Sequence, residues 1–230
     1  MSSAVIIPAR FDATRLPGKP LAELGGVPMV ERVRRQASLA RGIGGVWVAT
    51  DDPRIAQVIV AGGGAVIRTG PHPSGTDRVA EAAESLSARW ILNVQGDMPL
   101  LDPTYVEAVL ARLQAGAPIA TLAWRLSGDP ADPSQVKVVC DGAGRALYFS
   151  RAPVPHGGPW RVHVGIYGFQ REVLREVARL PVHPLERSER LEQLRWLAAG
   201  YEIRVDEVPV AVESVDTPAQ LQALRERMSR

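Results

Sequence analysis

Cysteine is almost missing from this chain of 230 residues. Cys140 is the only one, so no intrachain disulfide can form. The four histidines are scattered, and the chain has no spacing typical of a zinc site. Stability must therefore come from an apolar core, which a chain with 46% hydrophobic residues can build. A single cysteine also fits a reducing compartment, and we expect a cytoplasmic protein.

Long apolar runs and an excess of one charge are missing too. No run approaches the roughly 18 residues that a membrane span needs, and the short run at 4–7 is followed by Arg10, unlike a signal peptide. Lys and Arg total 27 while Asp and Glu total 25, and neither end carries a basic or acidic tail. We therefore expect neither a membrane span nor a nucleic-acid partner.

Two common nucleotide-binding motifs are also missing. Walker A requires Gly-x4-Gly-Lys-Ser/Thr, but in the related segment Ala13 replaces the first glycine and Pro20 replaces Ser/Thr. The dinucleotide fingerprint Gly-x-Gly-x-x-Gly occurs nowhere, which argues against a dehydrogenase.

Short apolar runs do alternate with helical patterns over residues 4–115. The runs at 4–7, 46–50, 65–68 and 90–94 predict strands without polar alternation, as in sheets that are covered on both faces. Asp52, Ser74 and Asp102 stand where helix N-caps are expected, and proline follows two of them. This rhythm predicts an α/β fold with a mostly parallel sheet and helices on both faces.

The second half has strands that lie closer together in the sequence. We expect strands at 119–126, 136–140, 146–150 and 163–169, helices at 170–179 and 188–199, and a last strand near 201–212. A capping box from Thr217 to Gln220 predicts a final helix over 217–228. The simplest prediction is one domain, 1–230, with a smaller antiparallel insertion at about 116–212.

Three cations lie on the loop that follows the first expected strand. Arg10, Arg15 and Lys19 share this loop with Gly18, and ligands in open α/β sheets bind beyond the carboxyl ends of strands. Arg can hold phosphate with two hydrogen bonds and Lys acts as a compact charge, so the loop suits a polyphosphate. The alternative is a solvated basic loop.

Two aspartates are candidates for a metal site. Asp97 follows Gly96 at the end of the expected strand 90–94, and Asp216 precedes the final helix. Taken alone, Asp97 is explained as a turn residue and Asp216 as compensation of the helix dipole. Together with the cationic loop they indicate a Mg²⁺–triphosphate site, because Mg²⁺ is usually bound by one or two carboxylates plus phosphates and water.

At this point the sequence resembles the CMP-Kdo synthetases, the 3-deoxy-manno-octulosonate cytidylyltransferases. The matching segments run in order over nearly the whole chain. They are Val-Ile-Ile-Pro-Ala-Arg10, Thr-Arg15-Leu-Pro-Gly-Lys19-Pro-Leu, Val-Ala-Thr-Asp51, Ser74-Gly-Thr-Asp-Arg78, Asn-Val-Gln95-Gly-Asp97, Val-Lys137-Val-Val, Ala-Leu-Tyr-Phe-Ser150-Arg151, His163-Val-Gly-Ile-Tyr167-Gly, Leu191-Glu192-Gln193-Leu-Arg195 and Val-Asp216-Thr-Pro. Each is weak alone, and the ordered set is highly specific.

The resemblance implies a glycosyltransferase-A-like nucleotidyltransferase fold. It implies transfer of CMP from CTP to 3-deoxy-D-manno-octulosonate (Kdo), with Mg²⁺ as cofactor, in a cytoplasmic homodimer that serves lipopolysaccharide assembly. The part at 1–115 would bind the nucleotide, and the part at 116–212 would bind the sugar acid and form the dimer. The implied residues are Arg10, Arg15, Lys19, Ser74 and Arg78 for the nucleotide, Asp97 and Asp216 for the metal, and Gln95, Arg151, His163, Tyr167, Glu192 and Gln193 for the sugar acid, with Arg10, Lys19, Asp97 and Asp216 catalytic.

The residues themselves test part of the sugar-acid set. Leu191, Leu194 and Ala198 would form the core stripe of the expected helix, so Glu192 and Gln193 would point to solvent or to a ligand. Arg151 suits a carboxylate. His163 as a lone histidine at a strand start is more often structural, and Ser74 is fully explained as an N-cap.

The chain departs from the family at three places. Met98 stands where the family commonly has Glu, Ser214 stands where glycine is usual, and the stretch 151–163 is shorter than in many relatives. Two alternatives therefore stay open. One is a cytidylyltransferase for another nonulosonic acid or an amino variant of Kdo, and the other is an inactive nucleotide-binding protein on the same fold.

Overall fold

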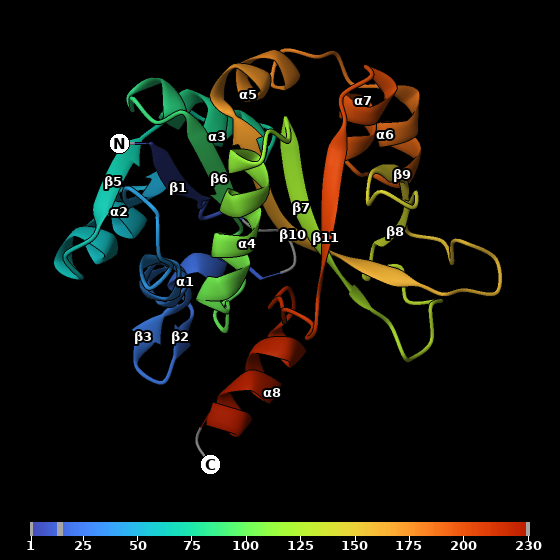
Figure 1. Ribbon diagram of the computed structural model, residues 1–230. Helices are drawn as coiled ribbons and strands as arrows, with labels where there is room; N and C mark the ends of the chain where they lie inside the picture. Colours follow the sequence, from blue (N-terminus) through green and yellow to red (C-terminus); the bar gives the residue numbers. More distant parts are fainter. Residues whose placement is uncertain (1, 13–15, 229–230) are drawn as a thin grey trace. The chain divides into compact units, whose positions relative to one another are not determined.

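The computed structural model describes residues 2–12 and 16–228, shown in Figure 1. By its internal contacts the chain forms two compact units. The first unit contains residues 1–107 and 212–230, and the second contains residues 108–211. The helix α4 (Pro103–Gln114) runs through the boundary between them.

The first unit is built on a parallel sheet with the strand order β6-β1-β4-β5. These strands are β1 (Ser3–Pro8), β4 (Val46–Thr50), β5 (Ala65–Arg68) and β6 (Trp90–Val94). β1 is almost wholly buried, which explains its unbroken apolar run. The predicted strands of this half are confirmed within one residue.

Three helices pack on this sheet: α1 (Met29–Ser38), α2 (Pro53–Ala61) and α3 (Gly75–Glu84). Their starts follow from side-chain caps. Asp52 accepts hydrogen bonds from the backbone N–H of Arg54 and Ile55, and the Ser74 hydroxyl accepts one from Asp77. The caps that the sequence predicts are confirmed.

A short helix and a hairpin lie between β1 and α1. They are η1 (Lys19–Leu21), β2 (Glu23–Leu24) and β3 (Val27–Pro28). Gly25 and Gly26 both have positive φ, as a two-residue hairpin turn of this kind requires. The sequence analysis did not predict these elements.

The chain returns to the first unit with α8 (Pro218–Met228). Gln220 N–H donates to the Thr217 hydroxyl, and the Gln220 side chain accepts from Thr217 N–H, so the predicted capping box is confirmed. Leu221 and Leu224 are buried in a small apolar cluster with Leu24, Met29 and Val215. This packing fixes the segment that carries Asp216.

The second unit contains a mixed sheet in which β7 (Ile119–Arg125) lies between β11 (Ile203–Val208) and β10 (Arg161–Gln170). β11 pairs with β7 in parallel and β10 pairs with it antiparallel. β8 (Lys137–Cys140) and β9 (Ala146–Ser150) form an antiparallel pair, and β8 also pairs with β10. The predicted antiparallel part is therefore present.

The helices of the second unit differ from the prediction at one place. α5 (Arg171–Val177) lies where expected, but the single helix predicted at 188–199 is two short helices, α6 (Pro184–Glu189) and α7 (Gln193–Ala198). Arg190 has a left-handed backbone with φ 55° and ends α6. The N-cap His183 with Pro184 after it is the start signal that the sequence analysis missed.

The α/β class with mostly parallel central strands is confirmed. Among the helices of the described residues, none is both long enough and apolar enough to cross a membrane. The prediction that residues 1–230 act as one domain is not tested by these contacts and stays a prediction.

Candidate active site

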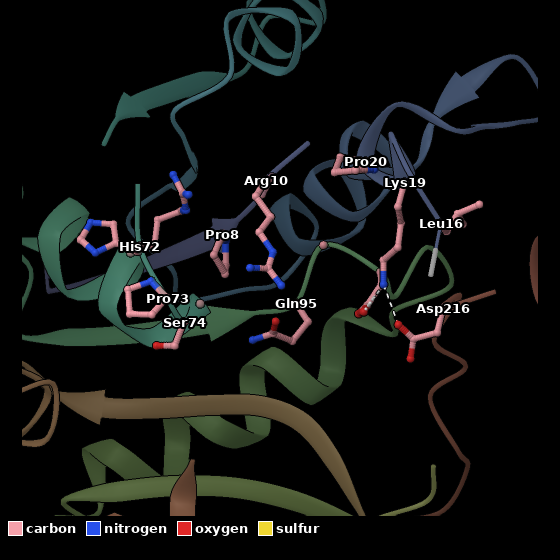
Figure 2. Close-up of a pocket in the computed structure, with 15 residues that line it drawn as sticks. Pro8, Arg10, Leu16, Lys19, Pro20, His72, Pro73, Ser74, Gln95 and Asp216 are labelled. Carbon is pink, nitrogen blue, oxygen red and sulfur yellow. Dashed lines mark hydrogen bonds and ion pairs between the residues drawn. The ribbon is translucent and has the colours of Figure 1, made fainter. Parts of the chain in front are cut away.

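A cavity of about 370 Å³ lies in the first unit, beyond the carboxyl ends of β1 and β6 (Figure 2). Such an edge of a parallel sheet is where ligands bind in open α/β folds. The lining side chains come from four segments that are far apart in the sequence. They include Pro8, Arg10, Leu16, Lys19, Pro20, His72, Pro73, Ser74, Arg78, Gln95, Asp97 and Asp216.

Lys19 and the two predicted metal ligands meet at one end of this cavity. Lys19 Nζ donates to Asp97 Oδ2 at 2.7 Å and to Asp216 Oδ1 at 2.8 Å. All three side chains are mostly shielded, with 16–26% of each exposed. The two carboxylates therefore converge on a single point, which is the arrangement that the sequence predicts for a cation site.

The backbone holds the two aspartates together. Val215 N–H donates to the Asp97 carbonyl at 2.9 Å, and Asp216 N–H donates to the Gln220 side chain at 2.7 Å. Asp97 itself lies on the turn that follows Asn93 and Val94 at the end of β6. The spacing of the carboxylates is thus set by backbone bonds and helix capping as well as by Lys19.

The arrangement suits a divalent cation such as Mg²⁺. The described residues contain no group of three or more His, Cys, Asp or Glu that could hold a metal alone. Asp97 and Asp216 supply two carboxylates, and Mg²⁺ usually takes one or two of these and completes its shell with phosphates and water. The residues therefore fit a metal that arrives with a polyphosphate.

The structure describes two of the three cationic side chains that the sequence places on the loop after β1. Arg10 is exposed and its side chain extends along the cavity between Lys19 and Ser74 (Figure 2). Arg15 lies outside the described residues. Lys19 follows Gly18, whose φ of 70° is a conformation that glycine adopts without strain. Arg10 and Lys19 are thus brought to one cavity.

Ser74 lies at the end of the cavity away from Lys19 (Figure 2), and Arg78 also lines the cavity. The Ser74 hydroxyl caps α3, as the residue pattern predicts. Arg78 is 3% exposed, and its Nη1 donates to the Thr69 hydroxyl at 2.6 Å and lies 3.1 Å from Asp51 Oδ1. These contacts show that Arg78 helps to form the wall of the cavity. Direct contact of either residue with a nucleotide stays a prediction.

His72 also lines the cavity, and the sequence analysis did not select it. Its ring Nε2 is in close contact with a carboxylate oxygen of Glu81, and Glu81 accepts a hydrogen bond from Gly70 N–H. The signal in the sequence was its place two residues before the N-cap Ser74, in a segment that follows a strand. Gln95, near the middle of the cavity, donates to the Asn93 side chain at 3.0 Å.

The remaining predicted sugar-acid residues belong to the second unit. His163 is half-buried on β10, and its Nε2 is 2.9 Å from the Thr121 hydroxyl. Burial lowers the pKa of His163 to about 3, so the ring is neutral at neutral pH. The His163 ring packs against Phe149 and Tyr167. Within the second unit, these contacts explain His163 as a packing residue.

Tyr167 shows a feature that structural packing does not explain. Only 7% of this residue is exposed, yet its buried hydroxyl has no hydrogen-bond partner among the described residues. Burial, together with the charge of Glu192, raises the pKa of Tyr167 well above its usual value. A buried hydroxyl normally finds a partner, so this one suits a ligand.

Arg151 is held on several sides by backbone carbonyls. Its Nε donates to the Glu189 carbonyl and its Nη1 to the Pro133 carbonyl, both at 2.9 Å. Its own N–H donates to the Glu189 carboxylate at 2.9 Å, and the buried Lys137 donates to its carbonyl at 2.8 Å. The guanidinium is therefore fixed in place before any ligand binds.

Gln193 does not point to solvent, and contact with a ligand, the other predicted alternative, stays a prediction. Gln193 is only 5% exposed, whereas Ala198, predicted in the core stripe, is exposed. The reason is that α6 ends before Arg190 and α7 begins at Gln193, so the residues of α7 do not follow the face pattern of a single helix over 188–199. Glu192 is partly exposed and is in close contact with Arg195.

Comparison with known proteins identifies the family of the chain. A family model described as "Cytidylyltransferase" matches residues 4–203. The chain is 49% identical to the 3-deoxy-manno-octulosonate cytidylyltransferase of Anaeromyxobacter dehalogenans (strain 2CP-C), with 96% of each chain covered. It is 44% identical to the enzyme of the same name from Escherichia coli, with 100% of this chain and 98% of the relative covered.

Solved structures give the same result. A CMP:2-keto-3-deoxy-manno-octonic acid synthetase complexed with CTP is similar with a TM-score of 0.95 and 42% identity, covering 100% of this chain and 99% of the other. A cytidylyltransferase from Leptospira borgpetersenii, at 17% identity and a TM-score of 0.67, shares the fold. With a family model that matches most of the chain and a relative that is 49% identical over 96% of it, this chain belongs to the 3-deoxy-manno-octulosonate cytidylyltransferase family.

Proposed function

We propose that this protein transfers CMP from CTP to Kdo and releases pyrophosphate. The observation that carries the proposal is the convergence of Lys19, Asp97 and Asp216 in a cavity at the carboxyl ends of β1 and β6. Retention of this set, together with Arg10, argues against the inactive nucleotide-binding protein as an alternative.

The nucleotide would lie along the cavity with its triphosphate at the Lys19 end. Lys19 and Arg10, with Arg15 as a further predicted cation, would neutralise the phosphates and the leaving pyrophosphate. Asp97 and Asp216 would hold Mg²⁺, which supplies charge neutralisation and aligns the attacking and leaving oxygens. Ser74 is a candidate for the nucleoside end, because it lies away from Lys19 in the same cavity (Figure 2). Arg78 also lines the cavity and is assigned to the nucleotide from the resemblance to the family.

The reaction would be an in-line displacement. The anomeric 2-hydroxyl of Kdo attacks the α-phosphate of CTP, the new P–O bond forms as the bond to pyrophosphate breaks, and the hydroxyl proton is lost. Such transfers depend on positioning and electrostatic stabilisation, so no covalent enzyme intermediate is required.

From the resemblance to the family, the residues that we assign to the sugar acid are Gln95 of the first unit and, in the second unit, Arg151, His163, Tyr167, Glu192 and Gln193. Two observations support this part of the proposal. The Tyr167 hydroxyl is buried without a partner among the described residues, and the Arg151 guanidinium is already fixed by carbonyls. A preorganised arginine suits the carboxylate of a sugar acid.

The cofactor, assembly and location complete the proposal. We expect dependence on Mg²⁺, a homodimer, a cytoplasmic location and a role in lipopolysaccharide assembly, all from the resemblance to the family. Of the family departures, Met98 is 3% exposed and packs inside the first unit. A buried methionine next to Asp97 adds no ligand to the metal site.

The test is pyrophosphate release from CTP and Mg²⁺ with a panel of acceptors. The panel contains Kdo, an amino variant of Kdo, a sialic acid and no sugar. Release with Kdo at the highest kcat/KM is expected. A higher kcat/KM with another acid would move the substrate assignment and keep the chemistry, whereas CTP binding without release in any mixture would support the inactive alternative.

A further inference from the structure

Arg54, at the start of α2, lies over the ring of Phe11. The guanidinium carbon is 3.3 Å from the ring centroid, which is a close cation–π contact. The guanidinium is held in place by Asp52, which accepts from Nε at 3.0 Å and from Nη2 at 2.6 Å. These contacts lie in the first unit and outside the cavity lining, so no step described above uses Arg54.

Phe11 in turn closes the loop that carries Lys19. The Phe11 carbonyl accepts a hydrogen bond from Gly18 N–H at 3.2 Å. The edge of the Phe11 ring fills the space where a side chain at Gly18 would begin, since an added Cβ would lie 3.3 Å from the ring. Gly18 is the N-cap of the short helix whose first residue is Lys19.

A continuous set of contacts thus leads from α2 to the cavity. Asp52 orients Arg54, Arg54 covers Phe11, Phe11 packs on Gly18, and the next residue is Lys19. We propose that Arg54 is a positioning residue that holds Phe11 against Gly18 and thereby fixes the Lys19 ammonium for the triphosphate of CTP. The proposal rests on the proposed function, because it assigns the triphosphate to the Lys19 end of the cavity.

Direct attraction of the phosphates by Arg54 is the competing explanation. The bidentate contact with Asp52 offsets much of the Arg54 charge, and 56% of the Arg54 side chain is exposed, so screening by solvent and salt is strong. Lysine at this position would keep the charge and lose the guanidinium contact with Phe11 and the bidentate contact with Asp52. The two explanations therefore predict different behaviour for Arg54→Lys.

The experiment compares Arg54→Ala, Arg54→Lys, Phe11→Ala and the Arg54→Ala/Phe11→Ala double variant. The control is Arg41→Ala, which removes a second exposed arginine that pairs with a carboxylate, Glu107, in the same unit. The cap of α2 survives in every variant, since Asp52 caps backbone N–H groups. Measured quantities are the KM for CTP, the KM for Kdo, kcat, the unfolding midpoint, and CTP·Mg²⁺ affinity by calorimetry.

We expect both Arg54 variants to raise the KM and the calorimetric Kd for CTP roughly two- to five-fold. The KM for Kdo should not change, and the unfolding midpoint should stay within about 2 °C. Phe11→Ala should have at least the same effect, and the double variant should be no worse than Phe11→Ala, because both changes break one set of contacts. Arg41→Ala should match the wild type.

Three outcomes would overturn the proposal. The first is an unchanged CTP affinity in Arg54→Ala, and the second is additive effects on CTP affinity in the double variant. The third is an Arg54→Lys variant that binds CTP as wild type does, together with a loss of CTP affinity in Arg54→Ala that disappears in high salt. The last result would assign Arg54 to direct attraction. Because calorimetry needs no acceptor sugar, a wrong sugar assignment would leave these comparisons intact.

Discussion

Lys19 and Asp216 lie 197 residues apart in the sequence and form an ion pair with an Nζ–Oδ1 distance of 2.8 Å. The same ammonium contacts Asp97 at 2.7 Å, so one cation holds two carboxylates at the edge of the sheet. This contact brings the loop that carries Lys19 and the two metal-ligand candidates to one place. In the second unit, the half-buried His163 and the buried Lys137 have environments with testable consequences of their own.

Asp97→Asn and Asp216→Asn should each lower kcat/KM roughly 100-fold or more, because an amide binds Mg²⁺ more weakly and offsets less charge. The assay is pyrophosphate release at saturating Mg²⁺. Asp102→Asn is the matched control, since Asp102 caps α4 from an exposed position and asparagine caps equally well. A loss of less than three-fold in both site variants would mean that the carboxylates hold no essential metal.

Lys19→Met should weaken CTP binding and strengthen binding of Mg²⁺ alone. The variant removes a phosphate ligand, and it leaves Asp97 and Asp216 facing each other without their shared cation. Calorimetric titrations with CTP and, separately, with MgCl₂ measure both effects. If Lys19→Met binds Mg²⁺ no better than wild type does, the two carboxylates do not form one cation site.

His163 should make the second unit sensitive to acid. Its folded pKa of about 3 lies below the ordinary value of 6.5, so the unfolded chain binds the proton more readily. The contribution of neutral His163 to the free energy of unfolding is fully present above pH 6.5. It is lost as the pH falls toward 3, and the free energy of unfolding falls by up to about 1.4 kcal/mol per pH unit.

The free energy of unfolding at pH 7, 5.5 and 4.5 tests this prediction on wild type and His163→Gln. Glutamine does not titrate and can still donate to Thr121. The variant should lose less stability than wild type between pH 7 and 4.5. Equal losses in the two proteins would show that His163 does not carry the effect.

Lys137→Ala should destabilise the protein by roughly 2–4 kcal/mol. Lys137 is fully buried and its ammonium donates to the carbonyls of Asp132 at 2.9 Å and Arg151 at 2.8 Å. The substitution leaves both carbonyls without this donor and opens a cavity. Denaturant unfolding measures the change, with the exposed Arg145→Ala as control. A loss below 0.5 kcal/mol would contradict the assignment of these bonds.

Local signals in the sequence predicted much of this structure. Asp52, Ser74 and Thr217 are caps because their side chains accept hydrogen bonds from nearby backbone N–H groups. A few neighbouring residues therefore decide where each helix begins. The strand ends located Asp97 and the loop of Lys19 because parallel strands end at a common edge. These features depend on short-range chemistry.

What the sequence did not predict depends on tertiary contacts or on a single backbone conformation. The break between α6 and α7 follows from the left-handed Arg190, a conformation that an arginine side chain does not signal. The contact of Arg54 with Phe11 joins a helix start to a loop 43 residues earlier in the sequence, and no local pattern specifies such a pair. His72 was missed although it stands two residues before the N-cap Ser74, because that local signal does not show that its side chain lines the cavity.

The most direct measurement is formation of the CMP–sugar product from CTP, Mg²⁺ and Kdo, followed together with pyrophosphate release, in wild type and Asp97→Asn side by side. We predict one equivalent of each product in the wild type, no release without Kdo, and a loss of both products in the variant with the fold intact. Absence of both products in the wild type, or equal rates in the two proteins, would contradict the account.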